Sequence, residues 1–156
     1  MKALITGSFD PITNGHLDLI KRTAAVFDDV TVGVFINPDK TYTFSEGQRL
    51  YMVREAISDI PNAKAVISHG LVTTYCKENG IDVIVKGVRN EEDFLYEQNM
   101  ALYNRQHCPT TETLFLPADP CVAHVSSSAV RTRFANGEDI SGYVPAVVAE
   151  EFTKLK

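Results

Sequence analysis

Two short segments of this chain carry residue types that bind phosphate groups. The first is a glycine-containing turn, residues 7–11, followed by Thr13-Asn14-Gly15-His16. A glycine turn lets the backbone approach a phosphate, and a helix beginning near Gly15 would point its free N–H groups the same way. His16 would then lie in the first helical turn and could donate to a phosphate oxygen. A histidine at a helix start can equally be a structural hydrogen-bonding partner, so this motif alone leaves both interpretations open.

The second segment is Ser126-Ser127-Ser128, with Arg131 about one helical turn further on. Serines at a helix start offer hydroxyls and exposed N–H groups to an anion, although three serines alone are more often simple caps. Neither a GxGxxG dinucleotide fingerprint nor a GxxxxGK[ST] phosphate loop occurs in the chain. Taken together, the two segments predict two helix N-termini that bracket one phosphate chain.

The elements that must position these segments follow from hydrophobic patterning and from capping and turn residues. The predicted strands are residues 2–6, 30–36, 64–68, 82–86 and 113–116. The predicted helices are residues 15–26, 45–57, 71–79, 90–106, 126–136 and 144–154. Ser45 with Gln48 forms a capping-box pattern, and Asn90 can cap the longest helix.

Strands that alternate with helices predict parallel pairing through right-handed crossovers. We therefore expect a single Rossmann-like α/β domain over residues 1–156, with a five-stranded parallel sheet and helices on both faces. Ligands of such sheets bind beyond the carboxyl ends of the strands. That edge would gather residues 7–16, 37–40, 68–72, 86–89 and 117–128.

Composition excludes several classes of protein. The chain has 156 residues, 44% of them hydrophobic, and a net charge of −5, which disfavours a nucleic acid as the main ligand. It contains no apolar run of the roughly 20 residues that a membrane span needs and no signal-peptide pattern at its start. Its 3 cysteines include no CxxC pair, so neither a disulfide framework nor a zinc site is indicated. We expect reduced thiols in a cytoplasmic protein without a membrane partner.

The motifs resemble those of the phosphopantetheine adenylyltransferase family, within the nucleotidyltransferase superfamily marked by (H/T)xGH and ISSTxxR. The (R/K)G(L/V)R…DFxYE…NR block is specific to that family. The similarity covers nearly the whole chain, through residues 7–16, Lys40, 44–49, 86–89, 93–97, 104–105 and 126–128. It implies transfer of AMP from ATP to 4′-phosphopantetheine, giving dephospho-CoA and pyrophosphate in coenzyme A biosynthesis.

The resemblance also implies roles for individual residues. His16 corresponds to the histidine that stabilises the transition state. ATP would be bound by Ser8, Phe9, His16, Gly87, Val88, Arg89, Glu97, Val122, Ala123, His124, Val125, Ser126, Ser127 and Ser128. The acceptor would be bound by Ser8, Lys40, Val72 and Lys86. The family usually has Arg where this chain has Lys86, and commonly an aromatic residue where it has Val122. Lysine keeps the charge but cannot make a forked grip on a phosphate.

The resemblance further implies a homohexamer, restraint by coenzyme A in the active site, and Mg²⁺ held mainly by the ATP phosphates. No dedicated carboxylate cage for a metal is evident in the sequence. Two alternatives stay open. One is a nucleotidyltransferase that uses nicotinate mononucleotide or glycerol phosphate, against which the family-specific block argues. The other is a non-catalytic nucleotide-binding domain, which would have no reason to keep both Lys40 and Lys86.

Simpler interpretations exist for most of these residues. Lys40 could be a solvated loop lysine, and Lys86 with Arg89 could be a solvated strand end. Glu97 could pair with Arg105 or with a lysine. Aromatic residues of the same helix are more often packing or interface residues than ligand contacts; these are Phe94, Tyr96 and Tyr103. The cysteines are expected to be buried or incidental; these are Cys76, Cys108 and Cys121.

Overall fold

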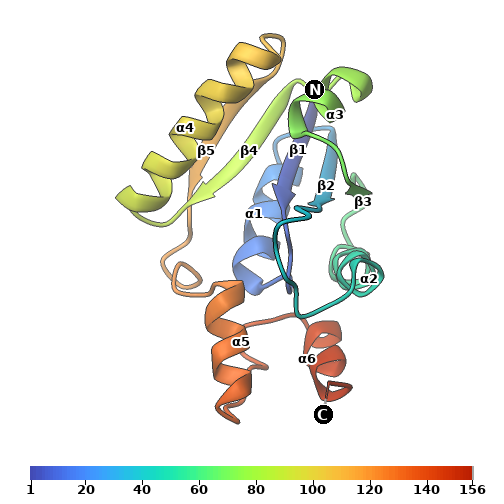
Figure 1. Cartoon of the computed structure of the whole chain (residues 1–156), viewed down its shortest axis with the longest axis vertical. Helices are drawn as coiled ribbons and strands as arrows, with labels where there is room; N and C mark the ends of the chain where they lie inside the picture. The colour runs from blue at the N-terminus through green and yellow to red at the C-terminus, as the bar shows by residue number, and fades with distance from the viewer. Residues whose placement is uncertain (156) are drawn as a thin grey trace.

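The computed structural model describes residues 1–155, and its five strands form one parallel sheet in the order β3-β2-β1-β4-β5 (Figure 1). The strands are β1 (Lys2–Gly7), β2 (Asp29–Phe35), β3 (Ala63–Ser68), β4 (Val83–Val88) and β5 (Glu112–Pro117). The helices are α1 (Asn14–Ala24), α2 (Glu46–Ala56), α3 (Val72–Asn79), α4 (Glu91–His107), α5 (Ser127–Ala135) and α6 (Ala146–Thr153). The predicted domain ran to residue 156, which lies outside the described residues.

Alternating side chains of β1 point to opposite faces of the sheet, as the period of a strand requires. Ala3 and Ile5 enter the larger apolar core, which contains Ile20 of α1 and Val53 of α2. Leu4 enters a second cluster, with Cys76 of α3 and Cys108 just after α4. The helices therefore cover both faces, α1 and α2 on one and α3 and α4 on the other. The predicted fold class is confirmed.

Local capping signals place most helix starts correctly. Ser45 and Gln48 form the predicted capping box, and the Asn90 side chain accepts from the Asp93 N–H. The fourth strand continues to Val88 and does not end at residue 86. Two helix boundaries were also wrong. The first helix ends at Ala24, not residue 26, because the N–H groups of residues 26 and 27 both turn back to the Thr23 carbonyl. The last helix begins at Ala146, after Pro145 at its N-cap, because a proline disfavours the helical conformation in the residue before it, here residue 144.

Helices α5 and α6 lie beyond the carboxyl ends of the strands, at the bottom of Figure 1. Phe152 of α6 fixes them there by packing on Phe44 and on Phe134, with ring centroids 5.0 and 4.6 Å apart. The carbonyl of Tyr143 accepts from the N–H of Asn14 at 2.9 Å. The C-terminal helices thus brace the start of α1 and the loop before α2. Within residues 1–155, none of the helices combines the length and apolarity needed to cross a membrane.

Candidate active site

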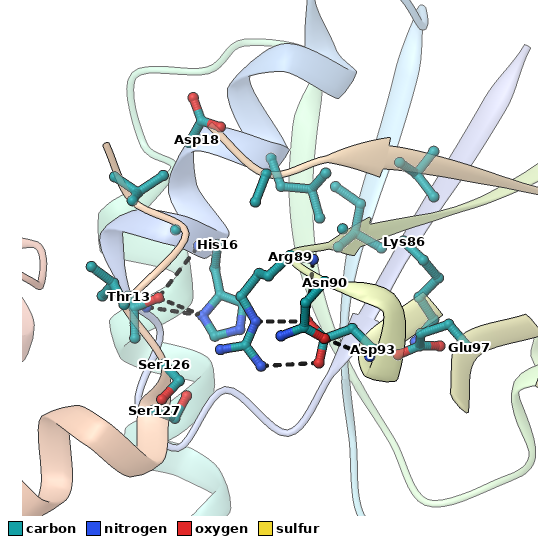
Figure 2. Close-up of a pocket in the computed structure, with 18 of the residues that line it drawn as sticks. Thr13, His16, Asp18, Lys86, Arg89, Asn90, Asp93, Glu97, Ser126 and Ser127 are labelled. Atoms are coloured by element: carbon teal, nitrogen blue, oxygen red, sulfur yellow. Dashed lines mark hydrogen bonds and ion pairs between the residues drawn. The ribbon is translucent and has the colours of Figure 1, made fainter. Parts of the chain in front are cut away.

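A cavity of about 570 Å³ opens at the carboxyl edge of the sheet, between the ends of β1 and β4 and the N-termini of α1, α4 and α5. Figure 2 shows His16, Arg89 and the serines of α5 converging on it from three different elements. The predicted site residues that line it are His16, Lys86, Gly87, Arg89, Glu97, Val122, Val125, Ser126 and Ser127. The two helix N-termini expected to bracket a phosphate chain therefore face one space.

The remaining predicted site residues do not line this cavity: Ser8, Phe9, Lys40, Val72, Val88, Ala123, His124 and Ser128. Phe9 is buried and packs edge-on against the His16 ring, with centroids 5.0 Å apart. Lys40 is exposed in the loop after β2, and Val72 packs beside the smaller core cluster at the start of α3. The roles assigned to these eight residues stay predictions.

His16 is the third residue of α1, and its side chain completes a capping box with Thr13. The Thr13 N–H donates to Nδ1 of His16 at 3.0 Å, and the Thr13 hydroxyl accepts from the His16 N–H. A backbone N–H can only donate, so Nδ1 must hold a lone pair. In the neutral imidazole the proton is therefore on Nε2, which is left as a hydrogen-bond donor.

Burial of the imidazole, and then the nearby charge of Arg89, lower the pKa of His16 from 6.5 to about 4. His16 is therefore neutral at pH 7. Figure 2 shows its ring beside the Arg89 guanidinium. The capping bond and the lowered pKa together give a neutral Nε2–H donor. The structural role and the chemical role of His16 are thus compatible, because they use different nitrogen atoms.

Arg89, at the start of the β4–α4 connection, is held by a forked ion pair with Asp93. Its Nε and Nη2 donate to the two carboxylate oxygens at 2.7 and 3.1 Å, and its backbone N–H reaches the same carboxylate at 3.2 Å. Hydrogen bonding to Arg89 lowers the pKa of Asp93 below its ordinary value. Nη1 of Arg89 donates to no acceptor within residues 1–155, so it is available to an anion. Arg89 is therefore bound by Asp93, and the interpretation of Arg89 as a merely solvated residue at the strand end is wrong.

Lys86 and Glu97 form a second, half-buried ion pair one turn further along α4, with Nζ and Oε2 3.4 Å apart. The suggested pairing of Glu97 with Arg105 is wrong, because Arg105 binds Glu112. Its partner is a lysine, but one of strand β4 and not of a helix face. Oε2 of Glu97 accepts no hydrogen bond within residues 1–155. Lys86 of β4 and Arg89 just after it thus both face carboxylates of α4.

The N-terminus of α5 has its hydroxyl groups engaged but its first N–H groups available. The Ser126 side chain caps the helix by accepting from the Ala129 N–H, and the Ser127 hydroxyl donates to the Pro11 carbonyl at 2.8 Å. The N–H groups of Ser127 and Ser128 meet no acceptor in residues 1–155. An anion would therefore be bound here mainly by backbone N–H groups and the helix dipole.

Gly15 explains how α1 and the segment before α5 come so close. A Cβ atom on Gly15 would stand 3.2 Å from the Val125 carbonyl oxygen and 3.4 Å from that of Val122. Backbone atoms cannot yield as a flexible side chain can. The glycine of the TxGH motif is thus needed for the approach of the two segments.

Contacts from two arginines hold the turn after β1, one from the half-exposed Arg131 and one from the buried Arg49, and sequence reasoning missed Arg49. Arg131 of the SSSxxR segment donates to the Asp10 carbonyl at 2.6 Å, so it contacts protein backbone. Arg49 of α2 donates to the Ser8 carbonyl at 2.9 Å. Between them Phe9 adopts φ of 48°, a left-handed conformation that is uncommon for a non-glycine residue. Arg49 ends the 44–49 segment of the family resemblance, but nothing in the sequence indicated that it is buried or that it contacts this turn.

The cysteines and acidic residues add little to this site. Cys76 and Cys108 are buried, as expected, and Cys121 is exposed. Within residues 1–155, no group of three or more His, Cys, Asp or Glu side chains is arranged to hold a metal ion. The carboxylates of Asp93 and Glu97 are already paired with cations.

Sequence comparison adds independent information. The cytidylyltransferase-like family model matches residues 4–133. A phosphopantetheine adenylyltransferase of Clostridium tetani is 43% identical over 152 residues, covering 97% of this chain and 95% of the relative. The enzyme of the same name from Frankia casuarinae is 44% identical over 154 residues, covering 96% and 94%.

Structural comparison supports the fold. A bifunctional NMN adenylyltransferase/ADP ribose pyrophosphatase from Francisella tularensis superposes with a TM-score of 0.74 at 15% identity, over 99% of this chain. The match spans 49% of that larger protein, and at this identity it shows a common fold only. The full-length sequence relatives are more specific. The chain therefore belongs to the phosphopantetheine adenylyltransferase family, within the cytidylyltransferase-like group.

Proposed function

We propose that this protein transfers the adenylyl group of ATP to 4′-phosphopantetheine, giving dephospho-CoA and pyrophosphate, a step of coenzyme A biosynthesis. The observation that carries the proposal is the convergence of two helix N-termini, the His16 Nε2–H donor and Arg89 on one cavity, in a chain of this family. Such a site suits the polyanionic centre of a reaction between a phosphate and a triphosphate.

The chemistry needs no protein nucleophile. An oxygen of the acceptor phosphate attacks the α-phosphorus of ATP. The bond between the α-phosphorus and the oxygen that bridges it to the β-phosphorus then breaks, and pyrophosphate leaves. The attacking phosphate is already ionised at neutral pH, so no general base is required. The difficulty is bringing two anions together, and catalysis then consists of in-line positioning and charge neutralisation. The neutral Nε2–H of His16 would donate to the α-phosphate oxygens, on which negative charge builds in the transition state.

ATP would be bound along the α4 and α5 side of the cavity. The free Nη1 of Arg89 and the N–H groups of Ser127 and Ser128 are suited to the phosphates. As the family resemblance implies, four further parts would complete the nucleotide site: the end of β4 at Gly87 and Val88, the turn residues Ser8 and Phe9, the Glu97 carboxylate and the segment 122–128. We propose MgATP as the nucleotide substrate, with Mg²⁺ bound to the phosphates and offsetting their charge.

The acceptor would be bound between Lys86 of β4 and the loops that follow β1 and β2. Lys86 lines the cavity, and its Nζ is paired with the Glu97 carboxylate. When the acceptor is bound, the acceptor phosphate would replace that carboxylate as the partner of Nζ. Lys40 and Ser8 would contribute from neighbouring loops, and Val72 would line the pantetheine arm. The position of Lys40 in an exposed loop at the same edge of the sheet supports this assignment.

Assembly, location and regulation follow from the family resemblance. We propose a homohexamer, and the exposed apolar side chains of α4, which include Leu95 at 60% and Leu102 at 56% exposure, support self-association. Analytical ultracentrifugation should then give six times the mass of one chain. A cytoplasmic location is supported by the three unpaired cysteines. Coenzyme A, as a product-like ligand, would compete for the active site.

A pyrophosphate-release assay tests the function. The purified protein is given MgATP with 4′-phosphopantetheine, nicotinate mononucleotide or glycerol phosphate in parallel. We expect rapid release with 4′-phosphopantetheine alone, and none in the absence of an acceptor. Faster release with another acceptor would identify a different nucleotidyltransferase. ATP binding without release for any acceptor would identify a nucleotide-binding domain.

A further inference from the structure

Arg49 is a buried cation that pairs with no carboxylate of residues 1–155. It is 1% exposed and is one of the largest fully buried side chains of the protein. Its guanidinium donates to the Ser8 carbonyl at 2.9 Å and lies 3.8 Å from the centroid of the Tyr42 ring. It forms no ion pair within residues 1–155, and its Nε has no hydrogen-bonding partner there. Burying an unpaired charge is costly, so an arginine at this point needs a reason beyond packing.

Both partners of Arg49 belong to loops that carry predicted site residues. The Ser8 carbonyl belongs to the turn after β1, and fixing its peptide plane holds the left-handed Phe9 that follows it. A non-glycine residue keeps such a conformation only when its surroundings impose it. Arg49 is therefore part of what sets the path of the turn beneath the cavity.

Tyr42 belongs to the loop after β2, in which Lys40 lies. Its hydroxyl accepts from the Asn37 N–H at 3.0 Å, so the ring that stacks on Arg49 also closes this loop. The other end of the loop is tied to the Asp10 carboxylate, which accepts from the N–H groups of Thr43 and Phe44 at 2.8 and 2.9 Å. Lys40 thus lies between two attachment points, one of which depends on Arg49.

We propose that Arg49 is a positioning residue for the acceptor: by binding the Ser8 carbonyl and stacking on Tyr42, it sets the turn that carries Ser8 and the loop that carries Lys40 in a fixed relation. The inference rests on the proposed function, because it assumes that these two loops hold the acceptor phosphate. Arginine suits the task since its planar guanidinium can donate along its edge while its face stacks on an aromatic ring. Of the ATP-side groups, Arg89 is held by Asp93 of α4, away from this turn. The start of α5 does reach the turn, through the Ser127 hydroxyl at the Pro11 carbonyl, two residues beyond Phe9.

The test compares Arg49→Gln and Arg49→Lys with Arg54→Gln, a matched change at an exposed arginine of the same helix. For Arg49→Gln we expect the acceptor KM to rise about 10-fold or more, as for loss of a charged hydrogen bond, and the ATP KM to change by less than about threefold. Arg49→Lys should recover part of the loss, and Arg54→Gln should behave as wild type. Hydrogen exchange should quicken at residues 37–44 and stay unchanged in α4.

Tyr42→Leu provides a second test in case the Arg49 variants do not fold, because Tyr42 is only half-buried and its replacement should be tolerated. It should reproduce the raised acceptor KM and the faster exchange, whereas Tyr42→Phe, which keeps the ring, should keep most of the acceptor affinity. Equal effects on both KM values, or a lower Tm with both KM values unchanged, would overturn the positioning role. If the wild type released no pyrophosphate with 4′-phosphopantetheine, the proposed function would fail instead, which is a distinct result.

Discussion

The N–H of Thr13 donates to Nδ1 of His16 across the first turn of α1, at 3.0 Å. This one bond decides what His16 can do, because it leaves the proton of the neutral ring on Nε2. The same bond completes the helix cap, so the local fold and the orientation of the donor are set together. His16 can therefore cap the helix through Nδ1 and donate to a substrate phosphate through Nε2.

The protonation of His16 can be measured directly. With the pKa of His16 lowered to about 4, nitrogen-15 NMR of the free protein should show one neutral tautomer, with the proton on Nε2, from pH 8 down to about pH 5. His16→Gln identifies the resonance by its loss. Titration of this ring near 6.5, or a proton on Nδ1 at neutral pH, would contradict the account.

The same pKa shift predicts a change in stability with a definite sign. The unfolded chain protonates His16 near pH 6.5, whereas the folded protein does so only near pH 4. Between these values the unfolded state binds more protons, so the His16 contribution to the free energy of unfolding falls as the pH is lowered. Urea unfolding at several pH values should show a shallower acid decline for His16→Gln than for wild type.

The Lys86 substitutions test the acceptor side of the cavity. Lys86→Arg restores the residue usual in the family and should leave activity within a few-fold. Lys86→Ala removes a charged contact worth about 1.5–3 kcal/mol, so it should raise the acceptor KM by roughly 10- to 150-fold. It also leaves the Glu97 carboxylate without its cation partner. Steady-state kinetics with each substrate varied in turn measure the two KM values. A raised ATP KM with an unchanged acceptor KM would assign Lys86 to the ATP site and contradict its role toward the acceptor.

Asp93→Asn tests whether Arg89 is held ready for phosphate. Asp93 binds Nε and Nη2 of Arg89, which orients the free Nη1 edge. Without the carboxylate charge the guanidinium should lose this orientation, and the ATP Kd should rise several-fold while the acceptor Kd stays near wild type. Calorimetric titration with ATP measures the effect. Tighter ATP binding by Asp93→Asn would mean instead that the carboxylate competes with phosphate.

The cysteines should have no part in turnover. Burial raises the pKa of Cys76 to about 11, so its thiol stays protonated and unreactive at neutral pH. Reductant, and Cys→Ser changes at Cys76, Cys108 and Cys121, should leave kcat near wild type. Cys76→Ser should lower Tm, because it puts a hydroxyl into an apolar cluster. Cys108→Ser should lower it less, because Oγ1 of Thr111 lies 3.2 Å from the Cys108 sulfur and could bind the new hydroxyl. Complete inactivation by any one of them in a folded protein would reveal a thiol role.

Much of the fold could be predicted because its signals are local. Buried strands are β-branched runs such as residues 30–36, and caps such as Ser45 and Asn90 act within three residues of themselves. His16 was found for the same reason, since its position in the first turn of a helix follows from the residues around it. The parallel order then places the loops at one edge of the sheet.

The contacts that could not be predicted join residues far apart in the sequence. Arg49 reaches Ser8 across 41 positions, and in the sequence it looks like the exposed Arg54 of the same helix. Periodicity reports which residues face a core, and an arginine is expected to face water. The Lys86–Glu97 pair could not be predicted either, because it joins a residue of strand β4 to a residue of helix α4 and depends on how the two elements pack.

The kinetics of His16→Ala test the central claim most directly. A donor fixed on the α-phosphate acts mostly in the transition state, and loss of such a group typically lowers kcat by about 10²–10³-fold. We expect His16→Ala to show this loss in steady-state kcat, calorimetric ATP affinity to change much less, and His16→Gln to recover part of the rate. Unchanged kcat in a folded His16→Ala protein would contradict the account and leave His16 with only its capping role.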